Sequence, residues 1–251
     1  MSALEIRFAV LQKQRIKMQN IVITGGSKGM GKAMAEKFAS AKNNIFICSR
    51  SEKELAKTAG EINKKYPGSV KYFSADLSLK KEVLRFSEWL LNKNIQIDIL
   101  INNAGNFVPG SVYNEPEGNL EKMMNINLFS AYYLTRALLS QMMKNKSGHI
   151  FNISSIAALK AYNNGGSYSI SKFAMMGFSK NLREEMKPYN IKVTTVYPGA
   201  VFTSSWEGAD ILPERIMEVD DIANMIFAAS SLSPQACVED IIIRPLLGDL
   251  P

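Results

Sequence analysis

Hydrophobic and polar positions along this chain follow two alternating patterns. Short runs rich in β-branched residues, such as Ile21-Val22-Ile23, are typical of buried strands. Between these runs lie longer segments in which apolar residues recur every three or four positions, as on one face of a helix. We expect seven strands, at Ile21–Thr24, Asn44–Cys48, Val70–Ser74, Ile97–Asn102, His149–Ser154, Lys192–Tyr197 and Ile241–Arg244. The clearest helices are expected at Gly29–Ala41, Glu52–Lys65, Lys80–Asn92, Leu120–Lys144, Ser167–Lys187 and Asp220–Ser231.

Alternation of strands with helices is the signature of βαβ units. Right-handed crossovers place such strands in one parallel sheet with helices on both faces. The predicted fold class is therefore α/β, a doubly wound seven-stranded parallel sheet of the Rossmann type, whose ligands bind beyond the carboxyl ends of the strands. Because no linker or solenoid repeat interrupts residues 18–251, we expect a single domain there.

The first seventeen residues differ from the rest. They have mixed polarity and no turn signals, and Met18 directly precedes the first strand pattern. An upstream extension before an original start at Met18, the remnant of a fused tag and a loose helix all agree with this composition. We therefore treat residues 1–17 as an N-terminal extension of the domain.

Composition and charge narrow the class of protein. The chain has 251 residues, 46% of them apolar and 21% charged, enough to bury a large core. Two distant cysteines, Cys48 and Cys237, form neither a disulfide framework nor a metal cluster, which indicates a reducing, cytoplasmic setting. No apolar run reaches the roughly 20 residues of a membrane helix, and the pattern of a secretion signal is missing. We expect a soluble protein without metal or membrane contact.

The net charge of +7 raises the question of nucleic-acid binding. Residues 1–17 carry four cations against one acid, which accounts for +3 of that charge. No basic run is interleaved with aromatic residues, so we interpret the remaining charge as a solvated surface and expect no nucleic-acid partner.

A glycine-rich turn, Thr-Gly-Gly-Ser-Lys-Gly-Met-Gly, occupies residues 24–31 directly after the first strand. Glycines there permit a tight turn and let backbone N–H groups at a helix N-terminus approach a pyrophosphate. Gly26, Gly31 and Lys32 also match the phosphate loop G-x-x-x-x-G-K. Because Ala33 stands where that loop needs a hydroxyl for Mg²⁺, we favour a dinucleotide site over a triphosphatase. Its contacts are expected from Gly25, Ser27, Lys28, Gly29, Met30 and Gly31.

The second predicted strand indicates which dinucleotide binds. A site for NAD(H) usually offers a carboxylate to the ribose 2′-hydroxyl at the end of this strand, whereas this chain has Arg50. Lys28 in the glycine turn adds a second cation. Two fixed positive charges without an acid suit a 2′-phosphate, so we expect NADP(H).

The helix after the fifth strand carries candidate catalytic groups. Tyr168 and Lys172 are four residues apart, which places a phenol and an ammonium on one helix face. Ser154 and Ser155 end the fifth strand near the start of that helix. A lone Y-x-x-x-K is a weak motif, and a surface pair is its simplest interpretation.

Further motifs follow the later strands. In chain order they are Ala75-Asp76-Leu77, Asn102-Asn103-Ala104-Gly105, Asn127, and Pro198-Gly199 through Thr203. Together with the glycine turn, Ser155, Tyr168 and Lys172, they resemble the ordered motifs of the short-chain dehydrogenase/reductase family, from Met18 to about Arg244. Ser155 rather than Ser154 has the family's separation from Tyr168.

This resemblance implies a mechanism. A hydride passes between the nicotinamide and a carbonyl carbon, while Tyr168 donates a proton to the oxygen. Lys172 is expected to lower the pKa of Tyr168 and to bind the nicotinamide ribose. Ser155 is expected to polarise the carbonyl, and Asn127 to hold a water that links Lys172 to solvent.

The resemblance also implies cofactor contacts from the remaining motifs. They are Asp76, Leu77, Asn103, Ala104, Gly105, Pro198, Gly199, Val201 and Thr203, beside Tyr168 and Lys172. Two of these contacts have a purely structural alternative, because Asp76 could be a helix N-cap and Pro198-Gly199 a plain turn.

Substrate contacts are expected from loops after the fourth, fifth and sixth strands. Phe107, Tyr162 and Trp206 could stack on a flat ring, with Glu207 or Asp210 pairing an amino group, although Trp206 could instead close a lid. The segment from Glu239 to Pro245 is similar to that of bacterial sepiapterin-reductase-like members, and the Asn-Gly-Gly motif usual in ketoacyl-carrier-protein reductases is missing. The expected function is reduction of a pterin such as sepiapterin or of a small dicarbonyl, with 3-oxoacyl thioesters as the alternative.

Other function classes fit less well. His149 is the only histidine and shares a strand with Ser155, so a Ser-His-Asp triad is implausible, and no G-x-S-x-G motif is present. A silent NADPH sensor remains an alternative, but all catalytic residue types are present. The resemblance implies a homodimer or a homotetramer.

Overall fold

The structure of this chain is a computed structural model, and it describes residues 18–203, 206, 208 and 211–250. Seven strands lie in one sheet in the order β3-β2-β1-β4-β5-β6-β7, and every neighbouring pair is parallel. The strands are β1 (Asn20–Thr24), β2 (Asn44–Ser49), β3 (Val70–Ser74), β4 (Ile99–Asn102), β5 (Gly148–Ile153), β6 (Ile191–Pro198) and β7 (Asp240–Ile243). The predicted fold class is therefore confirmed. The expected extension at residues 1–17 lies outside the described residues.

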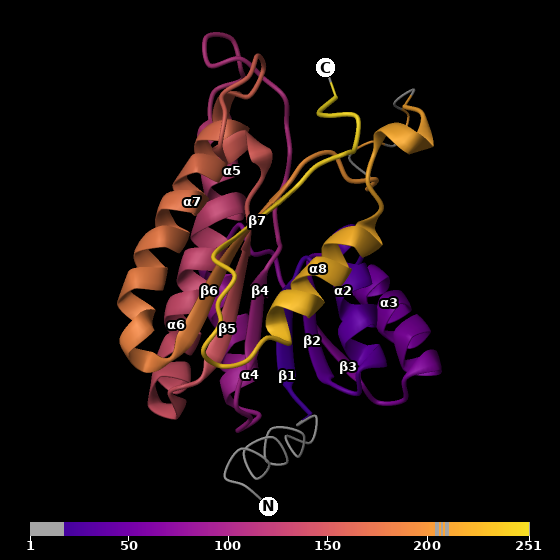
Figure 1. The fold of residues 1–251 in the computed structure, drawn as a ribbon, viewed down its shortest axis with the longest axis vertical. Helices are drawn as coiled ribbons and strands as arrows, with labels where there is room; N and C mark the ends of the chain where they lie inside the picture. Colours follow the sequence, from indigo (N-terminus) through magenta and orange to yellow (C-terminus); the bar gives the residue numbers. More distant parts are fainter. Residues whose placement is uncertain (1–17, 204–205, 207, 209–210, 251) are drawn as a thin grey trace, which may run out of the picture.

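Helices cover both faces of the sheet, as Figure 1 shows. One face carries α2 (Gly29–Ser40), α3 (Glu52–Lys65) and α8 (Val219–Ser230). The other carries α4 (Lys80–Leu91), α6 (Ser130–Asn145) and α7 (Gly166–Met186), with the short α5 (Asn119–Met124) at its upper end. Short 3-10 segments lie at Ile156–Ala158, Lys187–Tyr189 and Pro213–Arg215. Because all seven strands are parallel, the loops that follow them lie together at the carboxyl ends of the strands.

Alternating side chains of the central strands build two cores. Ile21 and Ile23 pack with the α2, α3 and α8 side, whereas Val22 packs with the α4, α6 and α7 side. All three side chains are fully buried. A parallel strand covered by helices on both faces needs such a continuous apolar run.

The helix expected at Leu120–Lys144 is interrupted. The chain forms α5, then a π-helical segment at Asn125–Phe129, and then α6. Asn127 lies within this segment and is fully buried. Single-turn π segments inside α-helices occur frequently at functional sites, because they redirect one side chain without ending the helix. The other predicted boundaries match or differ by at most two residues, as is usual for element ends.

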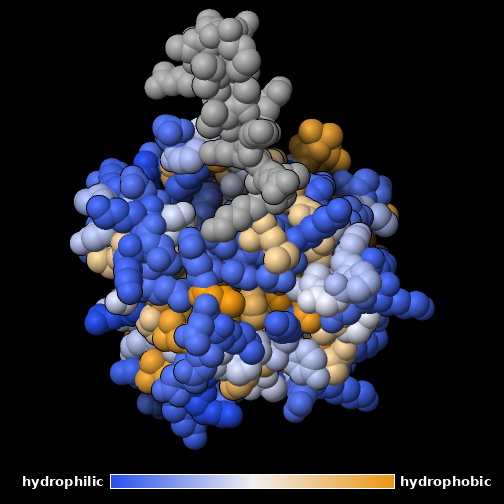
Figure 2. Space-filling view, turned by 90° about the horizontal axis from the view of Figure 1, so that it is seen from below, coloured by the Kyte–Doolittle hydropathy of each residue, from blue (hydrophilic) through white to orange (hydrophobic). Residues whose placement is uncertain are grey.

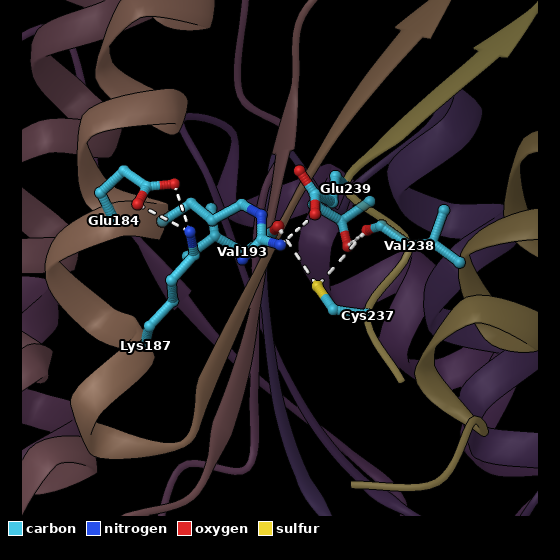
Figure 3. Close-up of polar contacts among 8 residues, drawn as sticks. Glu184, Lys187, Val193, Cys237, Val238 and Glu239 are labelled. Atoms are coloured by element: carbon cyan, nitrogen blue, oxygen red, sulfur yellow. Dashed lines mark hydrogen bonds and ion pairs between the residues drawn. The ribbon is translucent and has the colours of Figure 1, made fainter. Parts of the chain in front are cut away.

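The last strand closes one edge of the sheet, where β7 pairs with β6. Just before β7, Cys237 Sγ lies 3.7 Å from the Val193 carbonyl oxygen, a contact drawn in Figure 3. Glu239 pairs with Arg183 of α7. Cys48 and Cys237 are free cysteines. These contacts attach the C-terminal segment to α7 and β6.

The end of the molecule where the strands begin is mostly hydrophilic wherever Figure 2 displays described residues, with hydrophobic residues in small groups. No helix in the described ranges is long and apolar enough to cross a membrane. In the same ranges, no group of three or more His, Cys, Asp or Glu side chains could hold a metal ion. The predicted site residues gather at the opposite end, where the strands finish.

Candidate active site

The glycine turn between β1 and α2 is a narrow cradle. Gly25 and Gly29 have φ values of +67° and +53°, a region that L side chains rarely adopt. A Cβ on Gly31 would lie 2.1 Å from the carbonyl oxygen of Gly25, so any side chain there would push α2 away from the turn. No side chain caps the N-terminus of α2, and its first turn contains no acidic residue. The helix therefore offers its positive end and uncapped N–H groups to an anion.

Asn103 supports this cradle from the end of β4. Its Nδ2 donates to the carbonyl oxygens of Thr24 (2.9 Å) and Gly25 (3.3 Å). The backbone N–H groups of Asn103 and Ala104 both donate to Thr24 Oγ1 at 2.9 Å. The Asn103 amide group thus holds the glycine turn in place, and its Oδ1 is buried with no hydrogen-bond partner among the described residues.

The far end of the cradle is basic. Arg50 at the end of β2 and Lys28 at the start of α2 are both exposed, and neither forms an ion pair with any residue that the structure describes. Two unpaired cations beside a glycine cradle fit a phosphate of a dinucleotide.

Asp76 and Leu77 have roles in the fold. Asp76 Oδ1 accepts hydrogen bonds from Ser78 N (3.0 Å) and Ser78 Oγ (2.7 Å), so the carboxylate stabilises the turn that leads into α4. The side chain of Leu77 is buried in the core on the α4 side. The N-cap alternative for Asp76 is wrong, because Leu79 is the N-cap of α4 and Asp76 instead stabilises the turn before it. Its cofactor contact stays a prediction.

Ser154 and Ser155 occupy different environments. Ser154 Oγ donates to the backbone carbonyl oxygen of Lys172 at 3.1 Å and is buried. Ser155 is the N-cap of the 3-10 segment that starts at Ile156, and its Oγ accepts from Ala157 N at 3.1 Å. Its hydroxyl also interacts with the Tyr168 phenol. Ser155 is therefore the serine that faces Tyr168.

Tyr168 and Lys172 lie on one face of α7, as their spacing predicts. The Lys172 ammonium is 5.7 Å from the centroid of the Tyr168 ring and donates to the Ile153 carbonyl oxygen at 3.0 Å. Burial raises the pKa of Tyr168 to about 12, although the Ser155 hydroxyl opposes the shift. Burial also lowers the pKa of Lys172 to about 8. The shift is opposite to the lowering expected from Lys172, because removal from water is its largest cause.

Asn127 is held by the loop after β4. Its Oδ1 accepts from Asn106 N at 2.7 Å, and its Nδ2 donates to the Asn106 carbonyl oxygen (3.0 Å) and to Ser171 Oγ (2.9 Å). A Cβ on Gly105 would lie 3.1 Å from Asn127 Oδ1 and 3.6 Å from Lys172 Nζ. The structure thus brings Gly105, Asn127 and Lys172 into one cluster.

The loop after β6 reaches back to the glycine turn. A Cβ on Gly29 would lie 3.4 Å from Thr203 Cγ2. Gly199 N donates to the Ile243 carbonyl oxygen at 2.8 Å, and Val201 forms a parallel bridge with Met217. Pro198 is buried at the end of β6. The segment containing Pro198, Gly199, Val201 and Thr203 therefore connects the cradle to the C-terminal strand.

Of the three aromatic residues expected at the substrate, Phe107 packs against Tyr168. The Phe107 ring lies edge to face against Tyr168, with 4.8 Å between the ring centroids. Tyr162 is exposed, and its effect on Tyr168 is a minor electrostatic one that raises the pKa of Tyr168. Trp206 N donates to the Thr203 carbonyl oxygen at 3.0 Å. Glu207 and Asp210, expected to pair an amino group, lie outside the described residues.

Comparison with known proteins gives the family. A family model described as short chain dehydrogenase matches residues 19–210. The chain belongs to the short-chain dehydrogenase family.

Relatives of this short-chain dehydrogenase include a "Sepiapterin reductase" of Chlorobaculum tepidum, 33% identical over 92% of this chain and 97% of that protein. A "Diacetyl reductase [(S)-acetoin forming]" of Staphylococcus epidermidis is 32% identical over 80% of this chain and 77% of that protein. Among solved structures, a metagenomic short-chain oxidoreductase in complex with NADP is similar at a TM-score of 0.79 and 28% identity, over 90% of this chain and 96% of that one.

Two supporting residues of this short-chain dehydrogenase are missed by the sequence analysis. Ser171 accepts from Asn127 and donates to the Tyr168 carbonyl oxygen at 2.7 Å, and Asn106 clamps Asn127 through its backbone. Ser171 stands between Tyr168 and Lys172, yet its spacing alone carries no chemical signal. Asn106 acts through its backbone N–H and carbonyl groups, which every residue except proline has, so its identity in the sequence gives no signal.

His149 has no part in this site. It is buried in β5, where Nε2 lies 2.7 Å from Thr194 Oγ1 and the ring stacks on Phe151 at 3.9 Å. Burial lowers its pKa to about 3, so it is neutral at physiological pH. The histidine is part of the core, as the argument against a catalytic triad requires.

Proposed function

We propose that this chain is an NADPH-dependent carbonyl reductase that donates a proton from Tyr168. The observation that carries the proposal is a cluster beyond the carboxyl ends of β4 and β5, made of Ser155, Tyr168, Lys172 and Asn127. The glycine cradle, with the uncapped N-terminus of α2, lies at the same end of the sheet. Together these elements match what ketone reduction requires: a dinucleotide site, a proton donor and a hydrogen-bond donor for the carbonyl oxygen.

The cradle fits NADP(H). Gly25, Gly29 and Gly31 leave room for a pyrophosphate at the N-terminus of α2. Arg50 and Lys28, which have no ion-pair partner among the described residues, supply positive charge for a 2′-phosphate. We place the remaining cofactor contacts at the residues predicted from the motifs, from Ser27 and Met30 to Thr203. The NADP bound to the similar metagenomic oxidoreductase supports the same cofactor here.

When bound, the nicotinamide supplies the hydride for the carbonyl carbon. Tyr168 then donates its phenolic proton to the carbonyl oxygen as negative charge develops there. Its raised pKa keeps the phenol protonated at neutral pH, which is the form that reduction needs. The Ser155 hydroxyl orients the same oxygen as a neutral donor. Lys172, tied to the Ile153 carbonyl and adjacent to Asn127, places a positive charge behind the phenolate that is left.

For the substrate we propose a pterin such as sepiapterin or a compact dicarbonyl. Phe107 offers an apolar ring beside Tyr168, and Tyr162 is proposed as a second ring, which would suit a flat or small uncharged carbonyl compound. The name of the Chlorobaculum relative, a sepiapterin reductase, supports the pterin. The name of the Staphylococcus relative, a diacetyl reductase, supports the dicarbonyl. Trp206 is proposed as a third substrate contact.

For the assembly we propose a homodimer or homotetramer through α6 and α7. Phe129, next to α6, and Ile170 and Phe173 of α7 are exposed apolar side chains that a second copy would cover. Light scattering during gel filtration measures the assembly directly. A cytoplasmic location is likewise part of the proposal.

The deciding experiment is initial-rate oxidation of NADPH, with NADH in parallel, against sepiapterin, diacetyl and a 3-oxoacyl thioester. Tyr168→Phe serves as the blank. Saturable turnover with sepiapterin or diacetyl that the variant loses supports the proposal. Preference for the thioester would assign the site to acyl chemistry instead. Tight NADPH binding without turnover of any of the three would favour a sensor.

A further inference from the structure

The loop between β4 and α5 contains a carboxylate that no step of the proposed mechanism uses. We infer that Glu115 is a positioning residue, whose side chain caps α7 from this separate loop and so holds Tyr168 against Phe107. For its kinetic readout this inference rests on the proposed function.

The cap replaces one that α7 lacks. The residue before α7, Gly165, has no side chain to accept a hydrogen bond from the first turn. Glu115 supplies the acceptors instead: Oε2 lies 3.3 Å from Ser167 N, and Oε1 accepts from Ser167 Oγ at 2.5 Å. A carboxylate at a helix N-terminus satisfies free N–H groups and stabilises the positive end of the helix. The residue after Ser167 is Tyr168, so the cap acts next to the proton donor.

The same carboxylate reaches the helix that delivers Asn127. Glu115 Oε2 accepts from Asn119 Nδ2 at 2.8 Å, and Asn119 is the first residue of α5. α5 continues directly into the π segment that contains Asn127. One side chain thus joins the starts of the two helices that carry the catalytic groups.

Contacts on either side of Glu115 fasten the two loops together. Gly110 N donates to the Asn164 carbonyl oxygen at 3.0 Å, and Ser111 Oγ donates to Asn164 Oδ1 at 2.7 Å. Gly166 has a φ of +34°, and a Cβ there would lie 2.3 Å from the Gly110 carbonyl oxygen. Figure 1 shows the two loops projecting together above α5 and α7. The loop from Phe107 to Glu115 is therefore fixed to the start of α7.

The charge state of Glu115 suits this role. The hydrogen bonds from Ser167 and Asn119 lower its pKa below the ordinary value, so the group is a carboxylate at neutral pH. Ser167 and Asn119 are buried, which makes loss of their common acceptor unfavourable. A shift of α7 by a fraction of an ångström changes the approach of the Tyr168 phenol to the reacting oxygen, and such misplacements lower turnover steeply.

The test compares Glu115→Ala and Glu115→Gln with Glu117→Ala, a matched control in the same loop. Glu117 is exposed and has no hydrogen bond or ion pair within the described part of the chain. For Glu115→Ala we expect kcat to fall about tenfold or more, while the NADPH dissociation constant changes less than about twofold. Glu115→Gln keeps an acceptor for Ser167 and is expected to retain kcat within about threefold. Glu117→Ala is expected to match the wild type.

Hydrogen exchange separates this inference from the proposed function. In Glu115→Ala, amides at the start of α7 are expected to exchange about tenfold faster, whether or not a substrate has been found. Unchanged exchange there, or wild-type kcat in the folded Glu115→Ala variant, would overturn the inference. A parallel loss of kcat, NADPH affinity and thermal stability would also overturn it, because it would indicate general unfolding. If the wild type turns over no carbonyl compound, the proposed function fails, and the exchange result alone decides the role of Glu115.

Discussion

Ser154 donates its hydroxyl to the backbone carbonyl oxygen of Lys172, with 3.1 Å between the two oxygen atoms. This bond attaches β5 to the turn of α7 that carries the buried ammonium. The neighbouring Ser155 turns toward Tyr168 instead. The two adjacent serines thus have different roles. Ser154 binds the backbone of Lys172, whereas Ser155 interacts with the phenolic oxygen of Tyr168.

Substitution of each serine is expected to separate these roles. Ser155→Ala removes a donor to the carbonyl oxygen, and we expect kcat to fall by about 10²–10³. It also removes the acceptor for Ala157 N, so we expect a loss of about 1 kcal/mol in the unfolding free energy. Ser154→Ala removes a buried hydrogen bond, and we expect kcat within about threefold and a loss of about 1 kcal/mol in the unfolding free energy. NADPH oxidation and urea denaturation measure the two quantities. A collapse of kcat in stable Ser154→Ala with normal activity in Ser155→Ala would reverse the assignment.

Burial of Lys172 predicts a pH dependence of stability. Its pKa is about 8 in the fold and near 10.4 in an unfolded chain, so between these values the unfolded state binds more protons. The unfolding free energy contributed by Lys172 therefore rises as the pH increases from about 8 to 10. The full span corresponds to roughly 3 kcal/mol. Below pH 8 the protonated ammonium carries its complete burial penalty.

Comparison with Lys172→Met isolates this effect, because methionine keeps an apolar stem without the charge. Burial raises the pKa values of Cys48 and Tyr168 to about 12. In the unfolded chain both groups ionise at lower pH than in the fold, so each of them lowers the unfolding free energy at high pH. The difference between wild type and variant removes the Cys48 contribution, since that residue is common to both. We expect this difference to narrow toward pH 10 in urea titrations at fixed ionic strength. A difference independent of pH would show that Lys172 titrates normally.

Much of the fold follows from the sequence, because each central strand is a short apolar run bounded by turn residues. The π segment at Asn125–Phe129 does not follow. The apolar periodicity continues from Leu120 to Lys144, and the irregular turn coincides with tertiary bonds between Asn127 and Asn106. Periodicity reports which face of a helix is buried, and it is insensitive to a single extra residue in one turn.

The candidate site could be predicted as a set of residues but not as an electrostatic state. The spacing of Tyr168 and Lys172 places them on one helix face, which the structure bears out. The pKa of Tyr168 depends on how much water the surrounding loops exclude, and those loops come from distant segments. The role of Glu115 likewise depends on Ser167, 52 residues away. Such contacts have no local signal.

Two helical glycines provide a contrast in the cost of a methyl group. A Cβ on Gly31 would lie 2.1 Å from the Gly25 carbonyl oxygen, whereas a Cβ on Gly60 in α3 would meet nothing within 4 Å. Gly60→Ala is expected to raise the unfolding free energy by about 0.5–1 kcal/mol, because alanine favours the helix. Gly31→Ala is expected to lower stability by about 1–3 kcal/mol and to weaken NADPH binding. Thermal unfolding with and without NADPH measures both effects. Equal changes in unfolding free energy for the two variants would mean that the backbone around Gly31 moves to accept a methyl group at no cost.

Arg50 provides the sharpest test of the cofactor. A hydrogen bond to a charged group contributes about 1.5–3 kcal/mol, so we expect Arg50→Ala to raise the KM for NADPH about 10- to 100-fold. The KM for NADH is expected to change little, because NADH has no 2′-phosphate for the guanidinium to bind. Lys53→Ala is the control, since Lys53 is also exposed, lies at the start of α3 and has no ion pair among the described residues. A similar loss for both cofactors would place Arg50 near the pyrophosphate or outside the site. Loss for NADPH alone, stronger at low salt, would place Arg50 at the 2′-phosphate, because screening weakens exposed charge pairs.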